Sequence, residues 1–331
     1  MEETVQPFAG RIGVIGAGAL GAYYGACLAR AGHDVHFLMR GDYDAVRARG
    51  LEIRSVGGDF HIHPPVYASA AELGRCDLLV IGLKTTDNAS LPELLGPTAD
   101  SGTVVLTLQN GLGNEDAIAR VLAGATPDDH AVDARALPTA GRVVGGAAFL
   151  CSNRIAPGVI NHTDHGFIRL AEFTGASRPR THAIAELFRS SGVKCHVLDS
   201  LAEVRWSKLI WNVPFNGLGV AAPGADSAAV LADPVLCRVA RSLMSEVIAA
   251  ARADGVELEE SAADVSMERT ASMGAYRSSM QIDHECGRPL EVEAILGEPV
   301  RRAERAGIPV PAMRLLYAIV RRADEIARAR K

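Results

Sequence analysis

Lysine is scarce in this chain, and long runs of basic residues are absent from it. Only four of the 34 basic residues are lysine, namely Lys84, Lys194, Lys208 and Lys331. No more than two basic residues stand side by side, and the formal net charge is −5, which excludes nucleic acid as an expected partner. Because arginine supplies the routine positive charge, a lysine here is a candidate for chemistry that arginine cannot perform, such as giving up a proton.

Hydrophobic runs long enough to cross a membrane are absent as well. No apolar stretch reaches the ~20 residues that a spanning helix needs, and the acidic start Met1–Thr4 does not resemble a secretory signal. The six cysteines are scattered rather than grouped, which predicts reduced thiols in a cytoplasmic protein and no disulfide framework. With 331 residues, 48% of them hydrophobic, the chain is long enough for two globular domains.

Glycines near the N-terminus indicate a dinucleotide site. The β-branched run Arg11–Ile15 leads into a glycine-rich turn, a proline-free helical stretch at Ala22–Ala31 and a second strand at Asp34–Leu38. Three glycines of the turn have separate tasks: the first permits a tight turn, the second lets a pyrophosphate approach the backbone, and the third lets the helix pack on the strand. The helix N-terminus is then expected to face the phosphates. The predicted cofactor-binding turn is Gly16-Ala17-Gly18-Ala19-Leu20-Gly21.

The end of the second strand predicts which dinucleotide is bound. Sites for NAD usually carry Asp or Glu there for the ribose 2′-hydroxyl, whereas the 2′-phosphate of NADP calls for arginine. Arg40 occupies this place, and Asp42 follows two residues later in an expected turn. The sequence therefore favours NADP, the alternative being a solvated surface arginine.

Two further buried strands run into polar residues. Leu78–Leu83 is followed by Lys84, and Thr103–Leu108 is followed by Gln109 and Asn110. Open α/β sheets bind ligands at the carboxyl ends of parallel strands, so Lys84 and Asn110 are predicted cofactor-binding residues. The alternatives are a loop lysine and an ordinary Asn-Gly turn.

The remainder of the first half completes a Rossmann-type α/β domain. Residues 124–141 are rich in turn formers and predict a surface insertion. Apolar, β-rich segments at Val143–Leu150 and Gly166–Leu170 are expected to finish the sheet. A helix at Thr181–Ser190 and a strand at Val193–Val197 then close the domain.

An all-α second domain is predicted over residues 200–331, after a dinucleotide-binding domain over residues 1–199. One of its helices carries a polar stripe, since Lys208, Asn212 and Asn216 are spaced by four and each lies ~40° from the last. Burying such groups unpaired costs roughly a few kcal/mol, so the stripe is expected to face water, a partner or a ligand. Pro214 removes one helical hydrogen bond and is expected to kink this helix.

Several of these segments occur in a fixed order along nearly the whole chain. They are Gly16–Gly21, Gln109–Gly111, Lys208–Asn216, Ser278–Gln281, Gly287–Glu293 and Gly307–Pro311. This ordered set resembles the ketopantoate (2-dehydropantoate) reductase family. The resemblance implies an NADPH-dependent enzyme of pantothenate biosynthesis, in which C4 of the nicotinamide delivers hydride to the ketone carbon of 2-dehydropantoate.

The resemblance also implies roles for individual residues. The lysine that matches Lys208 is the general acid that protonates the ketone oxygen, a task that suits an ammonium beside developing negative charge. The glutamate that matches Glu291 accepts a hydrogen bond from the substrate hydroxyl; without the resemblance, an acid in a first helical turn is commonly a favourable contact with the helix dipole. The residues that match Asn212, Asn216 and Ser279 bind the substrate's polar groups, and the one that matches Asn110 lies beside nicotinamide and substrate.

Other interpretations stay open. A different small 2-oxo acid or ketone could be the substrate on the same scaffold. The chain could also be a non-catalytic NADP-binding sensor, although such a binder has no use for Lys208. A catalytic metal is not expected, because neither His162–His165 nor Asp283–Cys286 has a recognisable zinc spacing. The expected partner is a small-molecule 2-oxo acid, and the helical second domain leaves a homodimer open.

Overall fold

The computed structural model describes residues 8–131 and 133–329, and these form two compact units. Unit 1 runs to Gln109 and resumes at Asn114–Leu201, whereas unit 2 joins the loop Asn110–Gly113 to the residues from Ala202 onward. The chain thus leaves unit 1 briefly at the end of one strand and returns to it. The N-terminal segment Met1–Thr4, expected not to be a secretory signal, lies outside the described residues.

Unit 1 is built on one mixed sheet. Its described strands follow the order β4-β3-β9-β8-β7-β6-β1-β2-β5, with β10 beside β9. The central strands β1 (Ile12–Ile15), β2 (Val35–Leu38), β6 (Leu78–Ile81) and β7 (Val104–Thr107) pair in parallel and are almost entirely buried. Strands of this kind need helices on both faces, so the predicted Rossmann-type fold is confirmed. The other strands are β3 (Leu51–Ser55), β4 (Phe60–Ile62), β5 (Val66–Tyr67), β8 (Val143–Ala156), β9 (Val159–Glu172) and β10 (Cys195–Val197).

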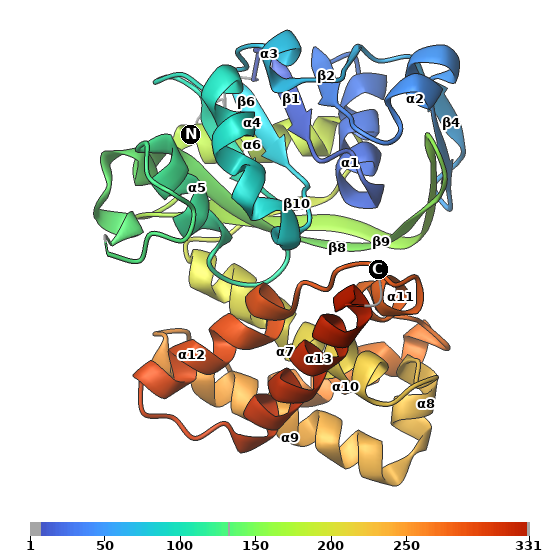
Figure 1. Ribbon diagram of the computed structural model, residues 1–331, viewed down its shortest axis with the longest axis vertical. Helices are drawn as coiled ribbons and strands as arrows, with labels where there is room; N and C mark the ends of the chain where they lie inside the picture. The colour runs from blue at the N-terminus through green and yellow to red at the C-terminus, as the bar shows by residue number, and fades with distance from the viewer. Residues whose placement is uncertain (1–7, 132, 330–331) are drawn as a thin grey trace, which may run out of the picture. The chain divides into compact units, whose positions relative to one another are not determined.

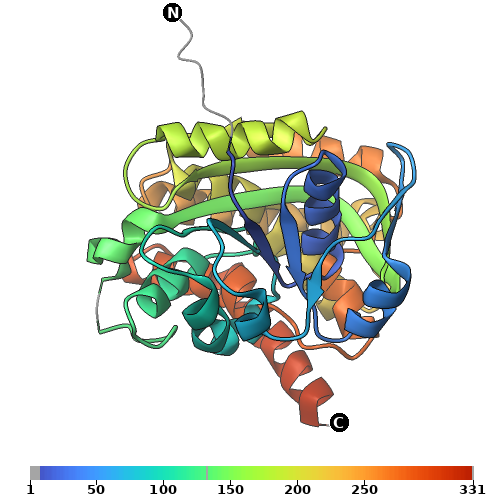
Figure 2. The ribbon, with the colours of Figure 1, turned by 90° about the horizontal axis from the view of Figure 1, so that it is seen from above.

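Helices cover the two faces of this sheet (Figures 1 and 2). On one face, α1 (Ala19–Arg30) and α6 (Pro179–Ser190) share a hydrophobic core with β1 and β2. Gly25 allows α1 to approach β2 closely, because a Cβ there would lie 2.6 Å from the Phe37 ring. The other helical segments of unit 1 are α2 (Tyr43–Arg49), α3 (Ala70–Leu73), η1 (Thr85–Ser90), α4 (Leu91–Thr98), α5 (Asn114–Leu122), η2 (Ala134–Ala136) and η3 (Pro138–Arg142).

The strands β8 and β9 form a hairpin longer than the sequence predicts. The apolar pattern identified their buried parts, whereas the segment around the turn at Gly158 is partly exposed and mixed in polarity. The strands β3, β4 and β5 were not predicted at all. They are short, and β4 and β5 carry no fully buried residue, so hydrophobic periodicity marks them poorly.

The described part of unit 2 contains helices and turns and no strand. The helix α7 (Leu201–Ala221) continues through Pro214 without interruption. Its apolar residues, among them Trp206 and Val213, join a hydrophobic core with α9 (Pro234–Ala253) and α13 (Pro311–Ala329). The remaining elements are α8 (Ser227–Ala232), α10 (Ser261–Met273), α11 (Ser279–Glu285), the π-helix η4 (Glu293–Gly297) and α12 (Glu298–Arg305). No helix in the described ranges has the length and apolar character of a membrane span.

Candidate active site

The carboxyl ends of four parallel strands lie level at one edge of the sheet in unit 1. The register pairs Ile15 of β1 with Leu38 of β2 and with Ile81 of β6, and Ile81 pairs in turn with Thr107 of β7. The residues that follow these strands therefore emerge side by side. The glycine turn, Arg40 and Lys84, predicted separately from three stretches of sequence, all follow strands at this edge, where such sheets bind ligands.

The glycine turn is tightly packed at two of its glycines and open at the third. Gly16 has φ +90°, and a Cβ there would collide with the backbone of Leu83. A Cβ on Gly21 would collide with the Gly16 carbonyl oxygen, so the helix can sit this close to the turn only without a side chain. Gly18 differs, because a Cβ there would meet nothing within 4 Å in the described protein. The space above Gly18 at the N-terminus of α1 is thus open to a ligand, as expected of a dinucleotide cradle.

Arg40 lies two residues beyond β2 and is exposed. Its guanidinium forms an ion pair of 2.9 Å with Asp87, a residue of η1 after β6. The nearby Asp42 is otherwise engaged, since its carboxylate accepts hydrogen bonds from Arg154 (2.8 Å) and from the backbone N–H of Gly158 (3.1 Å). Asp42, the acid that could have bonded a ribose 2′-hydroxyl, therefore holds the β8–β9 hairpin instead, whereas the exposed Arg40 pairs with Asp87 at the edge of the sheet.

Polar residues missed by sequence reasoning continue along the same edge. Asn88 accepts a hydrogen bond from the Gln109 amide (2.7 Å) and donates one to Asn114 (3.2 Å). Gln109 and Asn114 are only 3% and 1% exposed, so these amides form a buried brace between η1 and the end of β7. The sequence did not indicate Asp87 either, because nothing near this residue in the sequence predicts that it pairs with Arg40, 47 positions earlier.

In unit 2, the polar stripe begins with a direct contact between two predicted site residues. The Lys208 ammonium donates a hydrogen bond to the Asn110 side-chain oxygen at 2.6 Å. Both residues are half-buried, although 98 positions separate them. This short, charge-assisted bond fixes the position of the ammonium relative to Asn110.

The next two members of the stripe, Asn212 and Asn216, are buried at 6% and 2% exposure. The Asn216 side-chain oxygen accepts a hydrogen bond of 3.1 Å from the backbone N–H of Met280. Met280 follows Ser279, the first residue of α11, whose N-terminus is capped by Ser278 through a bond to Gln281. Asn216 thereby fixes the turn that presents Ser279, and Ser279 itself is exposed.

Glu291 lies at the start of the π-helix region and is 4% exposed. Its carbonyl oxygen accepts a bond of 3.2 Å from the Ile295 N–H, so the expected position at a helix start is confirmed. The Ala294 carbonyl oxygen, one turn along, accepts the Leu112 N–H at 2.9 Å. This bond docks the loop that carries Asn110 onto the segment that carries Glu291. Gly111 permits the contact, since it has φ +82° and a Cβ there would collide with the Ala294 carbonyl.

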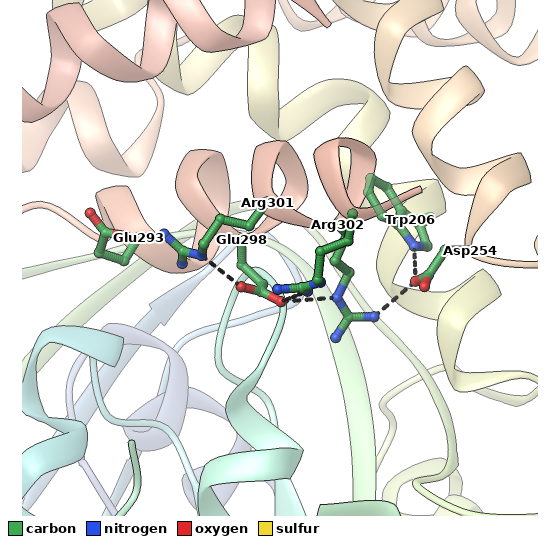
Figure 3. A network of polar contacts seen from close by, with 7 residues as sticks. Trp206, Asp254, Glu293, Glu298, Arg301 and Arg302 are labelled. Carbon is green, nitrogen blue, oxygen red and sulfur yellow. Dashed lines mark hydrogen bonds and ion pairs between the residues drawn. The ribbon is translucent and has the colours of Figure 1, made fainter. Parts of the chain in front are cut away.

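A network of ion pairs frames this part of unit 2 (Figure 3). Glu298 of α12 pairs with Arg301 (2.9 Å) and Arg302 (3.2 Å). Arg302 also pairs with Asp254, which accepts the indole N–H of the buried Trp206, each at 2.8 Å. On the other side, Arg301 pairs with Glu293 at 2.7 Å. The network thus joins Trp206 of α7 to Glu293 of the π-helix. Trp206 lies two residues before Lys208, and Glu293 lies two residues after Glu291.

Comparison with known proteins identifies the family of this chain. The family model described as ketopantoate reductase PanE/ApbA matches residues 12–175, and its C-terminal counterpart matches residues 200–324. The chain belongs to the ketopantoate reductase family.

Individual members of the ketopantoate reductase family resemble the chain over nearly its full length. A 2-dehydropantoate 2-reductase of Nostoc sp. is 40% identical over 311 residues, which cover 92% of either chain. One of Halobacterium salinarum is 32% identical and covers 95% of this chain and 99% of its own. The crystal structure of a 2-dehydropantoate 2-reductase from Geobacter metallireducens has a TM-score of 0.87 at 43% identity, covering 95% of this chain and 99% of that one.

Proposed function

We propose that the protein reduces 2-dehydropantoate to pantoate with NADPH as the hydride donor. The observation that carries the proposal is the contact of Lys208 with Asn110 in unit 2, in a chain whose unit 1 has an open glycine cradle and an arginine beyond β2. The 2-dehydropantoate reductases that match over almost the whole chain support the same reaction.

The residues of unit 1 fit NADPH. The pyrophosphate would rest on the Gly16–Gly21 turn, with the open face of Gly18 beneath it and the N-terminus of α1 opposite the charge. Arg40 would bind the 2′-phosphate, and the exposed Lys84 would add positive charge at the same edge. When bound, NADPH supplies the hydride that reduces the ketone carbon.

Lys208 is proposed as the general acid. A ketone oxygen gains negative charge as its carbon is reduced, and a positioned ammonium both stabilises that charge and can donate the proton. The Asn110 oxygen would hold the ammonium in place through the 2.6 Å bond. Among the described residues, no group of three or more His, Cys, Asp or Glu side chains is placed to hold a metal ion.

The other members of the proposed site bind the substrate. Glu291 would accept a hydrogen bond from the hydroxyl at the far end of 2-dehydropantoate, and Ser279 and Asn212 would bond its carboxylate and other polar groups. Asn216 belongs to the same set, and its bond to Met280 indicates that it also acts by holding the Ser279 turn. Glu291 is only 4% exposed, and a site built to bond a hydroxyl discriminates against analogues that lack it, so a substrate without the hydroxyl should be reduced poorly.

Steady-state oxidation of NADPH with a panel of 2-oxo acids tests the proposal. We expect 2-dehydropantoate to be reduced with a kcat/KM well above that for pyruvate, which lacks the distal hydroxyl. Equal efficiency for the two acids would point to a different 2-oxo acid. NADPH binding without turnover of any acid would instead support the non-catalytic sensor.

Two coarser properties complete the proposal. Four of the six free cysteines are buried, which suits a cytoplasmic protein with reduced thiols.

The helix α13 exposes Leu315, Ile319 and Ile326 at helical spacing, which supports a homodimer. Light scattering after size exclusion would test it, and a monomer at all concentrations would exclude it.

A further inference from the structure

The helix α13 carries one acidic residue where an apolar one is expected. Met313, Leu316 and Val320 are buried at spacings of three and four, and they form its core-facing side. Asp324 continues the same spacing and is only 7% exposed. A carboxylate in a core-facing position is unfavourable unless it is hydrogen-bonded or paired, so its partners indicate why it is there.

Asp324 has two partners in the described structure. Its Oδ1 accepts the backbone N–H of Leu290 at 3.0 Å, across 34 positions of sequence. Its Oδ2 pairs with Arg328, one turn along the same helix, at 2.7 Å. The bond to Leu290 connects Asp324 to the proposed site, because Leu290 immediately precedes Glu291 and is itself only 2% exposed. Arg328 lies at the surface, with about half of its side chain exposed.

Glu291 is therefore held on both sides by contacts to its backbone neighbours. Before it, Asp324 fixes the Leu290 N–H. After it, Ile295 bonds to the Glu291 carbonyl, and Ala294 docks the Asn110 loop. Backbone bonds on both sides fix the position of the Glu291 Cα and the direction of its Cα–Cβ bond, so they set where the carboxylate can reach.

We propose that Asp324 is a positioning residue that sets the place of Glu291 and thereby the enzyme's selectivity for a substrate with a distal hydroxyl. This inference rests on the proposed function of Glu291. Asp324 would act through the Leu290 backbone rather than by touching the substrate or the cofactor. Its effect should appear in discrimination between substrates rather than in hydride transfer as such.

The test compares two acids that differ only in the hydroxyl, 2-dehydropantoate and 3,3-dimethyl-2-oxobutanoate. The ratio of their kcat/KM values is measured for the full-length wild type, Asp324→Ala, Asp324→Asn and the surface control Arg328→Ala. We expect Asp324→Ala to lower the ratio about tenfold or more, mainly through KM for 2-dehydropantoate. Asparagine keeps an oxygen for the Leu290 N–H and should restore most of the ratio, and Arg328→Ala should leave it unchanged.

A double variant separates positioning from general damage to the fold. If Asp324 acts through Glu291, Asp324→Ala should not lower the ratio further in a Glu291→Gln background. An unchanged ratio in Asp324→Ala, or an additive loss in the double variant, would overturn the proposal. Should the alanine variant not fold, Asp324→Ser, which is one atom too short for the bond, takes its place under the same criteria.

The controls distinguish failure of this inference from failure of the proposed function. If the wild type prefers 2-dehydropantoate and Glu291→Gln removes the preference while Asp324→Ala does not, only the role of Asp324 is wrong. If the wild type reduces both acids equally well, the hydroxyl-binding role of Glu291 is wrong, and the role of Asp324 falls with it.

Discussion

Ketone reduction is proposed to depend most on Lys208. Lys208→Ala should lower kcat by roughly 10²–10⁴-fold, the usual contribution of a positioned proton donor. NADPH affinity should change little, since the predicted cofactor residues of the glycine turn lie in unit 1. Stopped-flow reduction and NADPH titration measure the two effects, and Lys194→Ala, an exposed lysine of unit 1, serves as the matched control.

Lys208→Arg separates charge from proton transfer. Arginine keeps the positive charge but does not readily give up a proton, so this variant should remain strongly impaired. A largely active arginine variant would mean that Lys208 only stabilises charge. Full activity in the alanine variant would remove Lys208 from the mechanism.

Arg40 is proposed to determine which nicotinamide dinucleotide the protein prefers. We expect NADPH to bind at least about tenfold more tightly than NADH, because charge-assisted bonds to the 2′-phosphate contribute about 1.5–3 kcal/mol. Arg40→Ala should remove most of this difference, and Arg47→Ala, on the nearby α2, should preserve it. Fluorescence titration measures both affinities, and equal affinities in the wild type would contradict the role of Arg40.

The residues found from the sequence share a local signature, and the residues missed do not. The glycine turn, Arg40 and Lys84 could be predicted because each follows a strand or interrupts a pattern. Glu291 was identified through family resemblance alone. Asp87, Asn88 and Asp324 act through partners that are distant in sequence, and nothing in their neighbourhoods indicates those partners.

At the scale of elements, the turn between β1 and α1 offers a direct test of cofactor binding. Gly18→Ala should leave the unfolding temperature of the free protein nearly unchanged, because the added Cβ meets no protein atom within 4 Å in the described residues. It should weaken NADPH binding by about tenfold or more, because the Cβ fills the space expected for the pyrophosphate. Differential scanning fluorimetry with and without NADPH measures both effects.

Gly21→Ala is the contrasting variant in the same turn. Its Cβ would collide with the Gly16 carbonyl, so it should destabilise the free protein by about 1–3 kcal/mol. If Gly18→Ala bound NADPH as tightly as the wild type, the cradle would have to lie elsewhere.

The ion-pair network around α12 makes the stability of unit 2 depend on pH. Burial would raise the pKa of Glu298, but hydrogen bonds from Arg301 and Arg305 outweigh it and hold the pKa below the ordinary glutamate value. A carboxylate with a lowered pKa in the folded state contributes stability above its unfolded pKa, and this contribution is lost as the pH falls through the folded value. Part of the stability should therefore disappear below about pH 4.

Glu298→Gln tests this dependence. The variant should be less stable than the wild type by about 1–2 kcal/mol at neutral pH, and the difference should shrink as the pH falls toward 3. Urea unfolding followed by tryptophan fluorescence measures it, since Trp206 belongs to the network. Glu257→Gln, at an exposed position, is the control, and a pH-independent difference would rule out ionisation of Glu298 as the cause.

At the scale of the whole chain, the sequence predicts an α/β part followed by a helical part, but it does not predict which unit the loop after β7 joins. Alternating strands and helices indicated the first unit, and the helical patterns after residue 200 indicated the second. The loop Asn110–Gly113 follows a strand of unit 1 yet clusters with unit 2. The loop is held in unit 2 by a hydrogen bond from the Leu112 backbone N–H to the Ala294 carbonyl oxygen. Every residue type offers these backbone groups, so the sequence does not predict such a bond.

The transfer of hydride to the ketone carbon of 2-dehydropantoate is the central claim, and isotope transfer tests it most directly. The protein is incubated with 2-dehydropantoate and NADPH that carries deuterium at the transferable C4 position of the nicotinamide, and the product is analysed by mass spectrometry and NMR. We expect pantoate with one deuterium at C2, formed in proportion to the NADPH consumed. No pantoate, or pantoate without deuterium, would contradict the proposed reaction.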